Sequence, residues 1–132
     1  MNNNADNITS DVPKGRPISN GVKVKDSKEI PLHPVTVEGA AGVSMRWLIS
    51  QKEAPNFVMR LFEVEKDGHT PLHTHPNEHE VFVLEGQGEL VFENTKNPFK
   101  AGYVLYVPAD KIHQFRNTGN GVMKFLCLIP NE

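Results

Sequence analysis

Glycine and proline divide this chain into short segments, and their spacing constrains its fold more than any other feature of the sequence. From Gly21 onward such a residue recurs about every 8 to 12 positions. Runs rich in valine, phenylalanine, leucine and tyrosine lie between them: Val43–Ile49, Phe57–Val64, Val81–Leu84, Glu89–Phe92, Tyr103–Val107 and Val122–Ile129. Short runs at this spacing are typical of β-sandwiches and barrels. The sequence therefore predicts an all-β fold, with Met45–Lys52 as the one segment that also fits a helix.

The first twenty residues differ from the rest of the chain. They are rich in asparagine, contain Pro13 and Pro17, and show no apolar period. Such a segment buries too little apolar surface to offset the entropy of ordering it. We expect residues 1–20 to form a flexible N-terminal arm and residues 21–132 to form a single β-barrel domain. An arm that pairs onto a neighbouring subunit is the alternative.

Composition excludes several classes of protein. A net charge of −2 argues against a nucleic-acid binder, which would carry a basic surplus. No apolar run approaches the roughly 18 residues that a membrane span needs. The N-terminus has neither the basic region nor the apolar stretch of a secretory signal. The single cysteine, Cys127, rules out an internal disulfide and favours a reducing compartment. We therefore expect a cytoplasmic protein.

The run Val81–Leu84 is apolar at every position, whereas a strand with one solvated face would alternate. Both of its faces are therefore expected to be covered, one by the barrel interior and the other by a second layer or subunit. This pattern predicts a homodimer. The following Glu85-Gly86-Gln87-Gly88 sequence joins two strand-like runs and is interpreted as a tight hairpin turn.

Three histidines within seven residues suggest a metal site. His73 and His75 are two positions apart, so on a strand they project to the same face. His79 follows a Pro76-Asn77 turn, and an antiparallel return would bring it beside them. Three neutral imidazoles could then bind one ion at about 2.0–2.2 Å, with occupancy that falls at acid pH. A solvated histidine-rich loop is the alternative. His33 and His69 are interpreted as structural, although a supporting contact from His69 to the site is conceivable.

Two segments together resemble the paired motifs of the cupin superfamily, over about residues 57–130. The first motif contains a glycine, a His-x-His pair, a glutamate and a second glycine, and here these positions hold Gly68, His73, His75, His79 and Gly86. The second contains a glycine, a proline, another glycine, a histidine and an asparagine, and here these positions hold Gly102, Pro108, Asp110, His113 and Asn117. The sequence departs from the motifs by a gap one residue shorter after Gly68, by a histidine in place of the glutamate, and by an aspartate in place of one glycine.

The resemblance implies a double-stranded β-helix, also described as a jelly-roll barrel. It also implies one divalent transition metal per chain (Mn, Fe, Ni, Cu or Zn), held by His73, His75, His79 and His113, as in small single-domain cupins of the conserved-barrel type. Glu80 is the rival fourth ligand, because the family permits one more intervening residue. Strand alternation lets only one of His79 and Glu80 point inward, and counting back from Gly86 favours His79.

The same alternation predicts which side chains surround the metal. Val81 and Val83 share parity with His79, and Phe115 shares parity with His113, so these three are candidates for the pocket lining as well as for ordinary core. Glu78 and Glu80 are the acids nearest the motif, but both are interpreted as solvated. Three further residues could bind an anion or pack at an interface, but surface solvation is the favoured interpretation for them: Arg46, Trp47 and Arg60. No catalytic acid or base is identified.

The resemblance implies two functions. One is a metal-dependent enzyme, an oxygenase, decarboxylase or isomerase, that acts on a small anionic or enolisable metabolite. The alternative is a non-catalytic, metal-containing module that binds or senses a small ligand. In either case the expected partner is a small molecule, because four neutral imidazoles leave an ion with its full charge and open coordination positions.

Overall fold

A computed structural model describes residues 21–131, and over this range the chain is almost entirely β-structure. A short 3-10 helix, Ser27–Glu29, precedes the strands. The strands are β1 His33–Pro34, β2 Ala41–Ile49, β3 Phe57–His69, β4 His79–Glu85, β5 Gln87–Phe92, β6 Thr95–Lys100, β7 Val104–Val107, β8 His113–Asn117 and β9 Met123–Pro130. The predicted arm, residues 1–20, lies outside the described residues. Between Gly21 and Asn131 there is no helix with the length and apolarity needed to cross a membrane.

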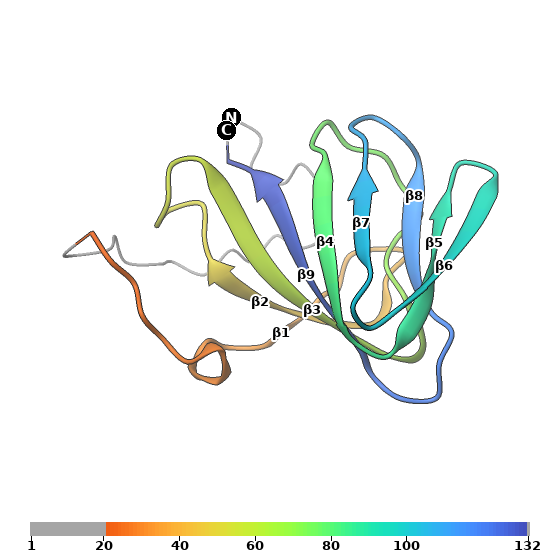
Figure 1. Ribbon diagram of the computed structural model, residues 1–132, viewed down its shortest axis with the longest axis horizontal. Helices are drawn as coiled ribbons and strands as arrows, with labels where there is room; N and C mark the ends of the chain where they lie inside the picture. Colours follow the sequence, from red (N-terminus) through yellow and green to blue (C-terminus); the bar gives the residue numbers. More distant parts are fainter. Residues whose placement is uncertain (1–20, 132) are drawn as a thin grey trace.

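The strands form one curled antiparallel sheet. Its order is β6-β5-β8-β3-β9-β4-β7, with β2 paired to β3 and β1 paired to β2. In Figure 1, β2, β3 and β9 form the left side, β8, β5 and β6 form the right side, and the β3–β4 and β7–β8 connections lie at the upper rim. This arrangement confirms the expected jelly-roll barrel. The Met45–Lys52 ambiguity is resolved in favour of a strand, because β2 continues to Ile49.

Alternation along the strands builds the core. On β9 every second residue from Met123 to Ile129 is buried, and β4 buries His79, Val81 and Val83 in the same way. Phe62 on β3 stacks on Phe125 on β9 with ring centroids 5.1 Å apart, and both side chains are buried in the core. The apolar face of each strand is thus packed inward, as the period of two predicts.

The interpretation of Glu85-Gly86-Gln87-Gly88 as a hairpin turn is wrong. β4 pairs with β7 and β9, whereas β5 pairs with β6 and β8, so this link carries the chain from one part of the sheet to another. Gly86 has φ +82°, and a Cβ there would lie 2.7 Å from the carbonyl oxygen of Val122. Glycine-rich links between two apolar runs occur both in hairpin turns and where the chain crosses from one part of a sheet to another. The local sequence therefore does not distinguish the two.

Candidate metal centre

Backbone hydrogen bonds join the two histidine segments at the rim. The His73 N–H donates to the His113 carbonyl at 3.2 Å, and the His113 N–H donates to the His73 carbonyl at 3.0 Å. The Asp110 N–H donates to the His75 carbonyl at 2.9 Å. Asp110 has φ +64°, a left-handed conformation that aspartate tolerates better than most residues, which explains how it can replace a glycine of the motif. The position of each histidine is thus set by main-chain pairing.

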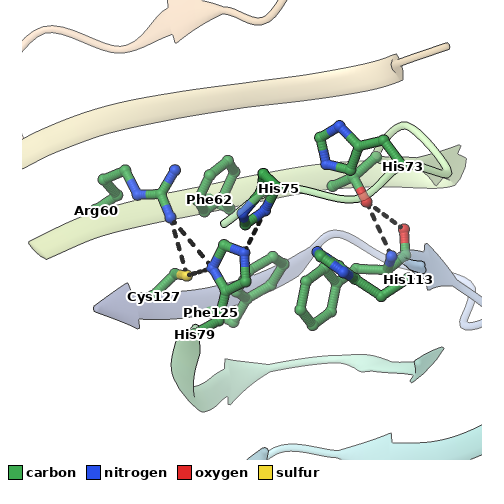
Figure 2. Close-up of a pocket in the computed structure, with 10 residues that line it drawn as sticks. Arg60, Phe62, His73, His75, His79, His113, Phe125 and Cys127 are labelled. Carbon is green, nitrogen blue, oxygen red and sulfur yellow. Dashed lines mark hydrogen bonds between the residues drawn. The ribbon is translucent and has the colours of Figure 1, made fainter. Parts of the chain in front are cut away.

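Four imidazole rings meet in the space between these segments and β4 (Figure 2). His73, His75 and His113 each offer a ring nitrogen, and these nitrogens all lie within 4.8 Å of one another. The His79 ring joins this group, with its centroid 4.4 Å from that of His75 and 5.1 Å from that of His113. The Nε2 atoms of His75 and His79 are 2.6 Å apart. Two lone pairs cannot face each other at this distance, so the nitrogens must share a proton or a cation.

Burial keeps all four imidazoles in the neutral form that binds metals. Loss of solvent, with repulsion from His113, lowers the pKa of His73 to about 4. The same causes, with further repulsion from neighbouring cationic groups, lower the pKa of His75 to about 3 and that of His79 well below its usual value. Burial also lowers the pKa of His113, against a hydrogen bond to the Lys111 carbonyl that raises it. Near pH 7 the rings therefore carry lone pairs instead of charge.

Two of the rings have a polar neighbour at their Nδ1 atoms. The Nδ1 atom of His113 lies 2.8 Å from the Lys111 carbonyl oxygen, which can only accept, so Nδ1 carries the proton and Nε2 is free to ligate. The Nδ1 atom of His79 lies 3.1 Å from the sulfur of Cys127. A metal-binding histidine commonly donates its second N–H to an acceptor in this way.

The cavity between the rings is small and mostly apolar. Its volume is about 10 Å³, room for roughly one ion or water molecule. Three phenylalanines form part of its wall, and it is lined by Arg60, Phe62, Thr70, His73, His75, His79, His113, Phe115, Phe125 and Cys127. None of these described lining residues is acidic. The arrangement suits a cation that keeps its full charge and then attracts a negatively charged ligand.

Arg60 was predicted to be a solvated surface residue, and this prediction is wrong. Its side chain is completely buried, its Nη2 donates to the sulfur of Cys127 at 3.1 Å, and its guanidinium carbon lies 5.0 Å from the centre of the Phe62 ring. Trp47 is directly opposite Arg60 on β2 and is also buried, contrary to the same prediction. The sequence does contain a signal for this burial. Arg60 lies two residues from both Val58 and Phe62, so strand alternation places all three on the inward face of β3.

The remaining predicted residues lie as follows. Phe115 lines the cavity, whereas Val81 and Val83 are buried in the core and are not among its lining residues. Glu80 is exposed on the outward face of β4, opposite in direction to His79. Glu78 is also exposed, and its carboxylate accepts from the Tyr106 hydroxyl at 2.6 Å.

The two histidines interpreted as structural lie elsewhere. His69 is not among the residues that line the cavity, and its Nδ1 lies 3.1 Å from the Thr70 carbonyl oxygen and 3.4 Å from the amide nitrogen of Gln114. His33 pairs with Met45 at the start of the sheet. Sequence reasoning also missed Thr70, Phe62, Phe125 and Cys127 as lining residues. Inward parity was the signal for the two phenylalanines and the cysteine, whereas Thr70 lies in a loop with no period.

Comparisons with known proteins agree with this geometry. The chain is 34% identical over 115 residues to an oxalate-binding protein of Thermotoga maritima, covering 83% of this chain and 93% of that protein. Among solved structures, the polyketide cyclase RemF from Streptomyces resistomycificus superposes with a TM-score of 0.78 at 31% identity, over 84% of this chain and 80% of RemF. A predicted oxalate decarboxylase from Thermotoga maritima gives 0.75 at 25% identity, over 83% of this chain and all of that one. The sequence model of the family described as "Cupin domain" matches residues 60–129. The chain therefore belongs to the cupin family.

Proposed function

We propose that this protein is a metal-dependent enzyme, an oxygenase, decarboxylase or isomerase, whose substrate is a small anionic or enolisable metabolite. The observation that carries the proposal is a group of four neutral imidazoles around one ion-sized cavity, three of them buried and that of His73 partly exposed. His73, His75, His79 and His113 would hold one divalent ion per chain, drawn from Mn, Fe, Ni, Cu or Zn. When bound, such an ion supplies Lewis-acid chemistry and, where it is redox-active, one-electron chemistry.

The charge around the cavity favours an anionic substrate. The imidazoles contribute no negative charge, the described lining residues include no carboxylate, and Arg60 places a permanent cation beside His79. The relative named for oxalate binding agrees with a small anion. Because the cavity holds little more than an ion, the substrate would bind on the side of His73, which is the least buried of the four histidines.

A second candidate function, ligand binding without chemistry, rests on a different observation. Apart from the four histidines, which a metal would occupy, and Cys127, the described lining residues include no side chain that commonly transfers protons: aspartate, glutamate, lysine and tyrosine are not among them. A cupin that only binds or senses its ligand needs none of them. Stabilisation by an anion without any turnover would favour this function over the enzyme.

Elemental analysis of untagged protein tests the metal site first. We expect near-stoichiometric metal in the wild type and in Glu80→Gln, and loss of most of it in His79→Ala. Metal retained by His79→Ala but lost from Glu80→Gln would assign the fourth ligand to Glu80. Loaded protein is then screened with small carboxylates, including oxalate, for thermal stabilisation, oxygen uptake and product release. Absence of metal in every preparation, even after reconstitution, would reject both functions.

The outer face of β4 and β7 supports a homodimer. Phe82, Leu84, Val104 and Tyr106 are all between 45% and 73% exposed there. A hollow of about 450 Å³ lies between Phe82, Val104 and Tyr106. Within the described part of the chain, β7 pairs with β4 alone, so its other edge is open to a further strand. We propose that a second copy of this chain covers this face, in a cytoplasmic setting that keeps the buried Cys127 thiol reduced.

A further inference from the structure

His79 has different neighbours at its two ring nitrogens. Its Nε2 faces the other imidazoles, 2.6 Å from the Nε2 of His75. Its Nδ1 faces away from them, 3.1 Å from the Cys127 sulfur and 3.5 Å from Nη2 of Arg60 (Figure 2). Cys127 and Arg60 are direct partners across β9 and β3, and both are completely or almost completely buried. Whichever neighbour Nδ1 bonds to decides where the proton of the neutral ring lies.

The two neighbours demand opposite tautomers. Arginine can only donate, so a bond from Arg60 requires an unprotonated Nδ1 and leaves the proton on Nε2, where it blocks a metal. The Cys127 sulfur can accept, so a bond to it requires Nδ1–H and leaves the Nε2 lone pair free. The distances favour the sulfur. A nitrogen separation of 3.5 Å is at the limit for a hydrogen bond, whereas 3.1 Å is a close contact for the larger sulfur atom.

Arg60 reinforces this choice. Its Nη2 lies 3.1 Å from the same sulfur, so the guanidinium has an acceptor other than the imidazole. We infer that Cys127 is a positioning residue, whose sulfur accepts a hydrogen bond from Nδ1–H of His79 and thereby turns the Nε2 lone pair toward the metal. The inference rests on the proposed role of His79 as a ligand. A carboxylate, carbonyl or water normally serves this purpose, and here a sulfur atom does so without placing a carboxylate in the cavity wall.

Removal of the acceptor should therefore weaken metal binding without removing a ligand. Cys127→Val keeps a similar volume but leaves Nδ1 to Arg60, which shifts the proton to Nε2. Loss of such a supporting contact typically weakens metal affinity by about 10- to 100-fold. Cys127→Ser retains an acceptor and should stay within a few-fold of the wild type. Cys127→Ala removes the acceptor with less steric demand and is used if valine disturbs folding.

Titration with Co²⁺ tests the inference in the wild type, the Cys127 variants and His79→Ala. Ile129→Val, at the next inward position of β9, is the packing control and should bind Co²⁺ as the wild type does. In metal-free protein, ¹⁵N NMR should show His79 protonated at Nδ1 in the wild type and in Cys127→Ser, and protonated at Nε2 in Cys127→Val. This proton is a signature that altered packing alone would not remove.

Three results would overturn the inference. In the first, Cys127→Val binds Co²⁺ as tightly as the wild type, whereas His79→Ala binds it more weakly. His79 would then be a ligand that does not need the sulfur. In the second, Cys127→Ser is as weak as Cys127→Val, which would assign the effect to packing. In the third, an intense near-ultraviolet sulfur-to-cobalt band disappears in Cys127→Val, which would make the sulfur itself a ligand. Unchanged binding in His79→Ala would instead reject the proposed fourth ligand.

Discussion

Metal binding should stabilise this fold by an amount that mass action allows us to estimate. The four imidazoles surround a small, mostly apolar cavity, and the Nε2 atoms of His75 and His79 are 2.6 Å apart. A divalent cation bound there interacts with the folded chain and hardly at all with the unfolded one. The gain is RT ln(1 + [M]/Kd), or about 2.7 kcal/mol when the free metal is 100 times Kd. For a chain of this size each kcal/mol raises Tm by roughly 3 to 5 °C, which gives a shift of about 8 to 14 °C.

Differential scanning calorimetry in chelator and in rising concentrations of each cation measures this shift. Tm should climb by a constant increment for every tenfold increase in free metal above Kd, and the shift should be much smaller in His75→Ala. Ser44→Ala, which alters a strand residue away from the site, is the matched control. A Tm that does not respond to Mn²⁺, Fe²⁺, Ni²⁺, Cu²⁺ or Zn²⁺ would refute the assignment of the four histidines to a metal.

Three further predictions concern pH, packing and assembly. Because the folded pKa of His73 is about 4 and that of the unfolded residue is near 6.5, the unfolded chain takes up protons first. The guanidinium concentration at the unfolding midpoint of metal-free protein should therefore decrease as the pH is lowered from about 6.5 to about 4. A midpoint that does not change with pH over this range would contradict the burial of neutral rings. Gly88→Ala should cost at least about 1–3 kcal/mol in chemical denaturation, because a Cβ there would lie 2.5 Å from a methionine sulfur and 2.9 Å from a phenylalanine ring. Gly121→Ala, with nothing within 4 Å, should be nearly neutral, and equal costs would reject the packing argument. In sedimentation velocity Phe82→Glu should be monomeric and Leu32→Glu dimeric, whereas a monomeric wild type would exclude the homodimer.

Local patterns in the sequence were sufficient to predict most of the strands that surround the site. Alternation and regular breaks predicted six of the observed strands to within a few residues, and the His73-x-His75 spacing predicted two rings on one side. The strand predictions succeeded because side-chain direction in a strand depends only on parity. His73 and His75 lie outside the strands, in the β3–β4 connection, and main-chain hydrogen bonds to His113 and Asp110 position them instead. The edge strand β6 was missed, since Pro98 breaks its pattern. An edge strand tolerates a proline because it needs hydrogen bonds on one side only.

Which strands become neighbours is a property of the whole sheet, and local sequence cannot supply it. The link at Gly86 was interpreted as a hairpin although β4 and β5 pair with different strands. Arg60 was placed on the surface because an arginine is rarely buried unless it is paired with other groups. Those groups come from other strands, so the local sequence could not reveal them. Its partner Cys127 is 67 residues away along the chain. No motif spacing relates these two residues to His79.

By itself, the sequence determined the periodicity of the strands, the parity of each side chain and the set of histidines that could share an ion. Only the tertiary structure decided that β3, β4 and β9 lie side by side, so that Arg60, His79 and Cys127 meet at one wall of the cavity. The physical reason is range. Backbone sterics fix side-chain direction within two residues, whereas burial, charge and tautomer depend on contacts between segments that only the folded sheet brings together.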